Sequence, residues 1–286
     1  MGELGDLSRR TAVVTGANSG IGEIAAASLA RAGAHVILAV RDITRGEIAA
    51  KGMAGNTEVR HLDLADLTSV RAFAAGITGP IDLLINNAGV MIVPKGRTKD
   101  GFETHIGVNH LGHFALTNLM LPQLTGRVVT VSSLAHRLGE VKPDDLNYER
   151  RHYVRFLAYA QSKLANLLFT HELHRRLQAA GSSVRALACH PGYARTNLGA
   201  HSENKVFDLV LSLADRTAQS AAAGAQPTLY AATEDLPGAT YVGPGGLQEM
   251  RGAPTVVRPA GKAHDDATAA ALWAASEQLT GVSWLL

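Results

Sequence analysis

Short apolar runs alternate with longer helical stretches along the chain, and this alternation constrains the fold more than any other feature. Seven runs are rich in β-branched residues: Thr11–Thr15, His35–Val40, Val59–Leu62, Ile81–Asn86, Val128–Ser132, Val184–Cys189 and Thr240–Val242. Continuous apolar runs of this length are typical of strands buried on both faces. Helical spacing marks Ile21–Arg31, Arg45–Met53, Leu67–Ala75, Phe102–Leu121, Tyr153–Ala180 and Ala218–Thr233. The pattern predicts an α/β fold with a doubly wound, seven-stranded parallel sheet.

Length and composition predict one globular domain over residues 1–286. The chain is 46% hydrophobic and 18% charged, and it contains no linker or repeat that would divide it. Irregular stretches follow several of the predicted strands. We expect substrate loops at 134–152 and 191–217 and a C-terminal extension over 236–286, because ligands bind beyond the carboxyl ends of parallel strands.

Charge and cysteine usage exclude some partners. The formal net charge is +2 and no run of Lys and Arg is present, so we do not expect a nucleic-acid partner. No apolar segment reaches the roughly 18–20 residues that cross a bilayer, so we do not expect a membrane partner. Cys189 is the one cysteine and cannot form an internal disulfide. This favours a reducing compartment, and the expected location is the cytoplasm.

A glycine-rich segment, Thr15–Gly22, joins the first predicted strand to the first predicted helix. Glycines there permit a tight turn and a close approach of the backbone to a pyrophosphate, which the helix N-terminus attracts. Three glycines alone are weak evidence, but their position between a strand and a helix strengthens it. The residues expected to hold the dinucleotide are Gly16, Asn18, Ser19, Gly20, Ile21 and Gly22.

The second predicted strand ends at Val40 and is followed by Arg41 and Asp42. An NAD site has an acidic residue at this position, whereas an Arg suits the 2′-phosphate of NADP. The pattern therefore favours NADP over NAD. The alternative is a solvated Arg41 that pairs locally with Asp42.

Two further segments extend the predicted cofactor site. Asp63, with Leu64, follows the third strand, where its carboxylate could contact the adenine amino group or cap the next helix; both readings stay open. Asn87, Ala88 and Gly89 follow the fourth strand, and the two small residues would let a cofactor lie against the backbone.

Tyr159 and Lys163 lie four residues apart in a helical stretch and therefore on one face. A phenol with a pKa of about 10 is a poor base, but a neighbouring ammonium favours the phenolate and lowers that pKa. The pair is a candidate acid/base unit. Taken alone, the motif would also fit an exposed structural pair.

Other polar residues follow strands or interrupt helices. Ser132 and Ser133 end the fifth strand, where a hydroxyl could hold a substrate carbonyl. Asn109 lies inside a predicted helix, which is unfavourable for Asn without a specific contact. Pro191-Gly192 follows the sixth strand and forms a turn suited to the nicotinamide.

This ordered set resembles the short-chain dehydrogenase/reductase family, especially its retinol dehydrogenase and protochlorophyllide reductase-like group. The resemblance covers about residues 11–200 and implies a single NAD(P)-binding Rossmann domain. The matching motifs are Thr15–Gly22, Asn86–Gly89, Asn109, Ser132-Ser133, Tyr159 with Lys163, and Pro191-Gly192. A departure is the spacing of 26 positions from Ser133 to Tyr159, about double the family's usual spacing, although that length occurs in the retinol-dehydrogenase-like group.

The resemblance also implies roles. Tyr159 would be the acid/base, while Lys163 would lower its pKa and bind the nicotinamide ribose. Ser133 matches the residue that steadies the reacting oxygen better than Ser132 does. Asn109 would hold a water that feeds Lys163, and Thr196 would contact the carboxamide beside Pro191 and Gly192.

The sequence thus predicts an NADP-dependent oxidoreductase that moves a hydride between nicotinamide and a small-molecule carbonyl or alcohol. Two alternatives stay open: a non-catalytic NADP-sensing protein, and a reductase of a carbon–carbon double bond. No metal is expected, because the pairs His110 with His113 and His171 with His174 lack a third ligand. A homo-oligomer could form through the predicted helices Phe102–Leu121 and Tyr153–Ala180, although those faces could equally be solvated.

Overall fold

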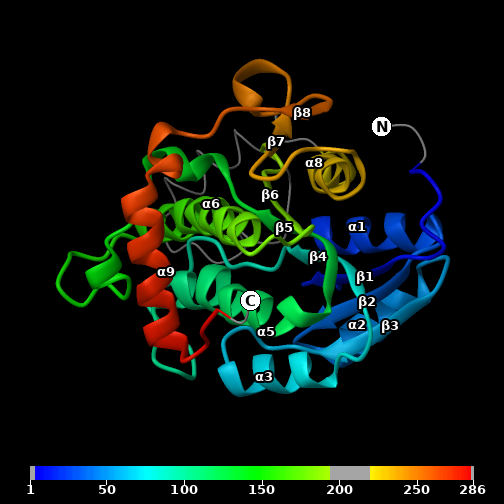
Figure 1. Cartoon of the computed structure of the whole chain (residues 1–286), viewed down its shortest axis with the longest axis horizontal. Helices are drawn as coiled ribbons and strands as arrows, with labels where there is room; N and C mark the ends of the chain where they lie inside the picture. Colours follow the sequence, from blue (N-terminus) through cyan, green and yellow to red (C-terminus); the bar gives the residue numbers. More distant parts are fainter. Residues whose placement is uncertain (1–3, 194–219, 285–286) are drawn as a thin grey trace.

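A single mostly parallel sheet forms the centre of the molecule (Figure 1). The computed structural model describes residues 4–193 and 220–284. Its strand order is β3-β2-β1-β4-β5-β6-β7-β8. The bounds are β1 Thr11–Thr15, β2 His35–Val40, β3 Thr57–His61, β4 Ile81–Asn86, β5 Leu124–Val131, β6 Arg185–Cys189, β7 Tyr241–Pro244 and β8 Pro254–Val256. The first seven strands are parallel, and β8 is antiparallel to β7.

Helices cover both faces of the sheet. On one face lie α1 (Gly20–Arg31), α2 (Ile43–Lys51) and α8 (Ala221–Thr233). On the other lie α3 (Leu67–Gly76), α5 (Gly112–Met120) and α6 (Arg155–Ala179), with α9 (Asp266–Thr280) packed on α6. The shorter helical turns are α4 Thr104–Ile106, η1 Gly107–Leu111, η2 Leu121–Gln123, η3 Leu134–Leu138, η4 Pro143–Asp145, η6 Leu247–Glu249 and η7 Gly261–His264.

The central strands are apolar because they contribute to two cores at once. Val13 and Ile37 point into the core beneath α3, α5 and α6, whereas Val14 and Leu38 point into the core beneath α1 and α8. All four are at most 4% exposed. Successive residues of a strand face opposite sides of a sheet, so a strand covered on both faces needs apolar residues throughout.

The predicted fold class is confirmed, and β1, β2 and β4 have the predicted bounds. The predicted number of seven strands is wrong, because the described residues form eight. The missed strand, β8, has three residues, begins with Pro254 and is antiparallel. A proline donates no hydrogen bond and is tolerated at an edge, so such a strand has no apolar run that the sequence could reveal.

The predicted helix Phe102–Leu121 is confirmed over Thr104–Met120, but it is not α-helical throughout. It consists of the short α4, a π-helical turn η1, and α5. Single π turns inside α-helices are rare and often lie at functional sites. Asn109 lies in this turn.

The C-terminal segment completes the packing around α5 and α6. Trp273 of α9 is 1% exposed and contacts Phe114 of α5 and Phe169 of α6, with ring centroids 4.9 and 5.8 Å away. The chain's own α9 therefore covers part of the α5 and α6 surface considered above for a partner. Among the described residues, no helix combines the length and the apolar character needed to cross a membrane.

Candidate active site

The predicted site residues follow strands that are neighbours in the sheet. Gly16 follows β1, Asn87 follows β4, Ser132 follows β5 and His190 follows β6. These four strands lie side by side in the order β1-β4-β5-β6. Because parallel strands end at the same edge, the segments that were separate in sequence converge on one edge of the sheet.

The glycine-rich loop is shaped for a ligand that approaches the backbone. Gly16 has a φ of 67°, and a Cβ there would lie 3.0 Å from Cβ of Ala88. A Cβ on Gly22 would lie 2.3 Å from Nδ2 of Asn87. Gly20 has a φ of 57° and open space where a side chain would be. Gly16 and Gly22 are thus required because a side chain there would meet neighbouring atoms. Gly20 leaves open space beside the backbone for a ligand.

The N-terminus of α1 differs from those of its neighbours. Asp42 and Asp66 cap α2 and α3 by accepting hydrogen bonds from backbone N–H groups, whereas Ser19 makes no such side-chain bond to α1. A helix N-terminus carries partial positive charge and attracts anions. Together with the open loop, these residues fit the pyrophosphate of a dinucleotide. Asn18 and Ile21 lie in the same loop and first turn.

Arg41 is exposed immediately after β2. The carboxylate of Asp42 accepts a hydrogen bond from the backbone of Arg45 at 3.0 Å, so its structural role is to cap α2. Arg41 therefore stands exposed at the carboxyl end of β2.

Asp63 and Leu64 follow β3. One carboxylate oxygen of Asp63 accepts a hydrogen bond from the backbone of Ala65 at 2.9 Å. Asp66, and not Asp63, caps α3. Leu64 is buried under Gly112, where a Cβ would lie 2.6 Å from the Leu64 carbonyl oxygen. The alternative in which Asp63 caps the next helix is therefore wrong.

The segment after β4 is tied to the glycine-rich loop. The Thr15 hydroxyl accepts hydrogen bonds from the backbone of Asn87 and of Ala88, each at 2.9 Å, and Asn87 Nδ2 donates to the Thr15 carbonyl. A Cβ on Gly89 would lie 3.0 Å from Asn109 Oδ1 and 3.5 Å from Lys163 Nζ. Gly89 therefore borders the predicted catalytic residues.

Tyr159 and Lys163 are both buried on α6, at 8% and 5% exposure. Lys163 Nζ lies 5.8 Å from the centroid of the Tyr159 ring and donates to the Val131 carbonyl at 3.1 Å. The exposed structural pair considered above is therefore wrong. Both side chains belong to the edge of the sheet where the site residues converge.

The pKa of Tyr159 corrects a prediction. Burial raises it above the ordinary value, and hydrogen bonding with the Ser133 side chain lowers it only in part. The net shift of the Tyr159 pKa is therefore upward, and not the lowering that the spacing to Lys163 predicted, because burial dominates. Burial also lowers the pKa of Lys163 to about 8. Sequence spacing alone could not reveal this, since it carries no information on desolvation.

The two serines after β5 have different surroundings. Ser132 is 2% exposed, and its hydroxyl donates to the Lys163 carbonyl at 2.7 Å. The Ser133 side chain accepts a hydrogen bond from the backbone of Ala135 and also interacts with Tyr159. Ser133 is thus the serine that lies beside the phenol, whereas Ser132 supports the helix.

Asn109 connects two segments through its amide, which contacts Val90 and Ser162. Its Oδ1 accepts from the Val90 backbone at 2.8 Å, and its Nδ2 donates to the Val90 carbonyl and to the Ser162 hydroxyl. Ser162 in turn donates to the Tyr159 carbonyl at 2.7 Å. The polar side chain inside a helical stretch therefore holds the segment after β4 against α6.

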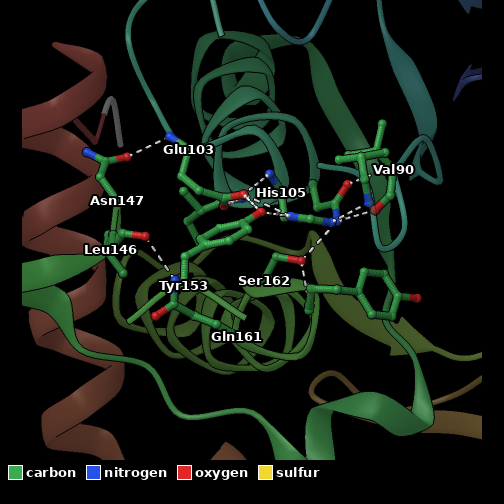
Figure 2. Close-up of polar contacts among 12 residues, drawn as sticks. Val90, Glu103, His105, Leu146, Asn147, Tyr153, Gln161 and Ser162 are labelled. Atoms are coloured by element: carbon green, nitrogen blue, oxygen red, sulfur yellow. Dashed lines mark hydrogen bonds and ion pairs between the residues drawn. The ribbon is translucent and has the colours of Figure 1, made fainter. Parts of the chain in front are cut away.

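The sequence did not predict a buried polar cluster next to Tyr159, the Glu103 cluster, which consists of Glu103, His105 and Tyr153 (Figure 2). Glu103 and His105, at most 1% exposed, pair at 2.8 Å, and the Tyr153 hydroxyl donates to Glu103 at 3.0 Å. The backbone of Glu103 donates to Asn147, which anchors the insertion 134–152. The His105 ring packs edge-on against the Tyr159 ring at 6.2 Å. The Glu103-x-His105 spacing was the only local signal.

The turn after β6 is held from a distant segment. His190 is buried, accepts from the Gly192 backbone through Nδ1, and contacts Glu249 through Nε2 at 3.1 Å. Glu249 also pairs with Arg137, close to Ser133 in the chain. Pro191 and Gly192 therefore lie at the edge where the other site residues converge. Thr196 and most of the predicted loop 191–217 lie outside the described residues.

Comparisons with known proteins identify the family of this chain. The short chain dehydrogenase family model matches residues 10–206. The chain belongs to the short-chain dehydrogenase family. It is 45% identical to human retinol dehydrogenase 13, with 96% of this chain and 85% of that protein covered. Human retinol dehydrogenase 12 is 43% identical, with coverages of 97% and 88%.

Solved structures are also similar to this chain. An uncharacterised protein from Mycobacterium paratuberculosis is 55% identical, with a TM-score of 0.88 and coverages of 99% and 98%. A Beutenbergia cavernae protein described as an NAD(P)-dependent gluconate 5-dehydrogenase, solved with bound NADP, is 27% identical, with a TM-score of 0.62 and coverages of 80% and 91%. This short-chain dehydrogenase is an NAD(P)-dependent oxidoreductase that acts on alcohol or carbonyl groups.

Proposed function

We propose that this chain reduces carbonyl groups and oxidises alcohols with NADP(H), using Tyr159 as the proton donor and acceptor. The observation that carries the proposal is the burial of Tyr159 beside Ser133 and one turn from Lys163. When bound, the nicotinamide supplies or accepts the hydride. The pyrophosphate of the cofactor would be held by Gly16, Ser19, Gly20 and Gly22. The nicotinamide ribose would be held by Lys163.

The chain's own residues then manage the proton and the reacting oxygen. Ser133 donates a hydrogen bond that orients the oxygen, and the Tyr159 phenol gives a proton to the developing alkoxide. Its raised pKa keeps the phenol protonated at neutral pH, which suits reduction. Oxidation needs the phenolate, so its rate should rise as the pH increases towards that pKa.

Tyr159→Phe tests this assignment because it removes the hydroxyl and keeps the ring. We expect turnover to fall by about 10²- to 10⁴-fold, the range of general acid catalysis. NADPH affinity, measured by fluorescence titration, should change little. Full turnover by the variant would contradict the assignment, and NADPH binding without any turnover by the wild type would favour the NADP-sensing alternative.

Arg41 supports NADP as the preferred cofactor. A guanidinium can bind a 2′-phosphate through two charge-assisted hydrogen bonds, and Val40 supplies no carboxylate that would repel it. We expect Arg41→Ala to lower kcat/KM for NADPH at least tenfold and to leave kcat/KM for NADH within about twofold. A wild-type preference for NADH that survives the substitution would overturn the choice of NADP.

For the substrate, we propose an apolar alcohol or aldehyde. The retinol dehydrogenases named above are similar over almost the whole chain. Leu138 and Leu247 support the proposal, because both are exposed, at 65% and 78%, and the Arg137–Glu249 ion pair joins their two segments. Arg137 lies four residues after Ser133 in the chain. A panel of retinal, long-chain aldehydes and polar sugars decides the matter. Higher kcat/KM for the polar members would contradict an apolar substrate.

A further inference from the structure

His113 lies where three segments of the site meet. It is the second residue of α5 and is 1% exposed. Its Nε2 lies 2.9 Å from the Thr15 hydroxyl at the end of β1. Its Nδ1 lies 3.1 Å from the Asn109 carbonyl oxygen in the π-helical turn. The chemistry proposed above does not use this imidazole.

The surrounding hydrogen bonds fix the tautomer of His113. The Asn109 carbonyl only accepts, so Nδ1 carries the hydrogen and Nε2 is an acceptor. The Thr15 oxygen already accepts from the backbone of Asn87 and Ala88, so its own hydrogen is donated. Of its two acceptors, Nε2 at 2.9 Å is closer than the Ile85 carbonyl oxygen at 3.4 Å, so the hydrogen points to Nε2. Burial lowers the pKa of His113 to about 4, which keeps the ring neutral at neutral pH.

The contacts continue beyond Asn109 to the catalytic helix. The Asn109 amide binds Val90 and Ser162, and the Ser162 hydroxyl donates to the Tyr159 carbonyl (Figure 2). A connected path thus runs from Thr15 through His113 to the Asn109 main chain, and from the Asn109 side chain through Ser162 to the backbone of Tyr159. One end borders the glycine-rich loop and the other carries the phenol.

We propose that His113 is a positioning residue that couples the dinucleotide loop to the catalytic helix. Its Nε2 contact fixes the Thr15 hydroxyl and hence the backbone of Asn87 and Ala88. Its Nδ1 contact fixes the Asn109 carbonyl and hence the π-helical turn beside Lys163. The inference rests on the proposed function of the Tyr159 site.

Three substitutions separate the two contacts. In His113→Asn the side-chain amide lies near the position of Nδ1 and keeps a donor for the Asn109 carbonyl. In His113→Gln the amide reaches the position of Nε2 and keeps a partner for Thr15. His113→Phe keeps the ring volume and loses both contacts.

The expected results differ between binding and turnover. His113→Phe should lower kcat about tenfold and weaken NADPH binding about fivefold, as expected for buried hydrogen bonds left unmade. His113→Asn should recover most of the kcat, whereas His113→Gln should recover most of the NADPH affinity. A residue needed only for stability would change both quantities in parallel with the melting temperature.

His110→Phe is the matched control. His110 lies one turn earlier, is equally buried at 1%, and contacts the Ser276 hydroxyl of α9 at 2.9 Å. It should leave kcat and NADPH affinity within about twofold of the wild type. The proposal is overturned if His110→Phe lowers kcat as much as His113→Phe, if all three His113 variants lose kcat and affinity together, or if none of them changes either quantity.

NADPH affinity is measured by fluorescence titration, which needs no substrate. If the wild type binds NADPH but turns over no member of the panel, the proposed function fails, and the affinities of His113→Phe and His113→Gln still decide whether the Thr15 contact matters. If His113→Phe, His113→Gln and the wild type bind NADPH with equal affinity, that result alone overturns the proposed coupling.

Discussion

Lys163 is a cation at a place where water is largely excluded. Burial lowers its pKa from an ordinary value of 10.5 to about 8, so the folded chain holds this proton less tightly than the unfolded chain does. The Val131 carbonyl that accepts from Nζ also accepts from Asn166 Nδ2 at 3.0 Å. The buried ammonium therefore lowers the free energy of unfolding, and the site keeps it because the proposed reaction needs it.

This imbalance predicts that Lys163→Met stabilises the fold and abolishes turnover. Below pH 8 the lysine is charged in both states and its burial cost is complete, so the variant should gain about 1–3 kcal/mol in free energy of unfolding at pH 7. Between pH 8 and 10.5 only the unfolded chain keeps the proton, so the wild type gains stability as the pH rises and the difference shrinks.

Urea unfolding at pH 7, 8.5 and 10 measures this difference. Lys142→Met, at a side chain that is 44% exposed, is the control and should differ from the wild type by less than about 0.5 kcal/mol at each pH. A Lys163→Met variant that is less stable than the wild type at pH 7 would contradict the assigned cost of burial.

At the scale of elements, the Glu103 cluster joins α4, the insertion 134–152 and α6. Burial raises the pKa of Glu103, but the hydrogen bonds from His105 and Ile106 and the charge of His105 outweigh it and leave the pKa below 4.5. The ionised carboxylate therefore stabilises the fold above pH 4.5, and this contribution is lost as the pH falls through the lowered pKa.

Glu103→Gln should lower the free energy of unfolding by about 1–3 kcal/mol at pH 7, because it disrupts buried hydrogen bonds to a charged group. The difference from the wild type should shrink below pH 4.5. Urea titrations at pH 7 and pH 4 measure both effects. Glu149→Gln, which breaks the exposed pair with Arg97, should cost less than about 1 kcal/mol. Equal losses in the two variants would refute the special role of the buried cluster.

The sequence could predict the elements whose signals are local. β1, β2 and β4 are apolar because both faces are buried, so their bounds match their runs of residues. The π-helical turn at Asn109 was not predictable, since one turn of π-helix and one of α-helix show nearly the same spacing. The Glu103–Tyr153 contact joins residues 50 positions apart and leaves no periodic signal.

In the site, too, some features have a local sequence signal and others depend on tertiary contacts. The positions of Tyr159, Lys163 and Ser133 followed from motifs, whereas the raised pKa of Tyr159 depends on how completely the folded chain buries it. His113 illustrates the limit clearly: its two partners come from β1 and from the preceding turn, and only the tertiary structure brings them together.

At the scale of the whole molecule, α9 closes the core beneath α5 and α6. Trp273 stacks on Phe169, contacts Phe114 edge-on and contacts Trp284 at 5.6 Å. Because this side chain is 1% exposed, its removal leaves a cavity among aromatic rings.

Trp273→Ala should therefore lower the free energy of unfolding by about 3–5 kcal/mol. Trp273→Phe fills part of the space and should cost less. Guanidinium unfolding followed by circular dichroism measures both. Leu247→Ala, at a residue that is 78% exposed, should change stability by less than about 0.5 kcal/mol. A comparably small loss in Trp273→Ala would mean that α9 contributes little to the core.

The two edge strands of the sheet, β3 and β8, affect whether molecules of this chain can associate by strand pairing. At one edge, β3 places Glu58 and Arg60 in a 2.6 Å ion pair along the strand. At the other, β8 has only three residues and starts with Pro254, which offers no amide hydrogen. Charged or proline-containing edges are poor templates for adding a further strand. The chain should therefore resist aggregation through edge-to-edge strand pairing even at high concentration.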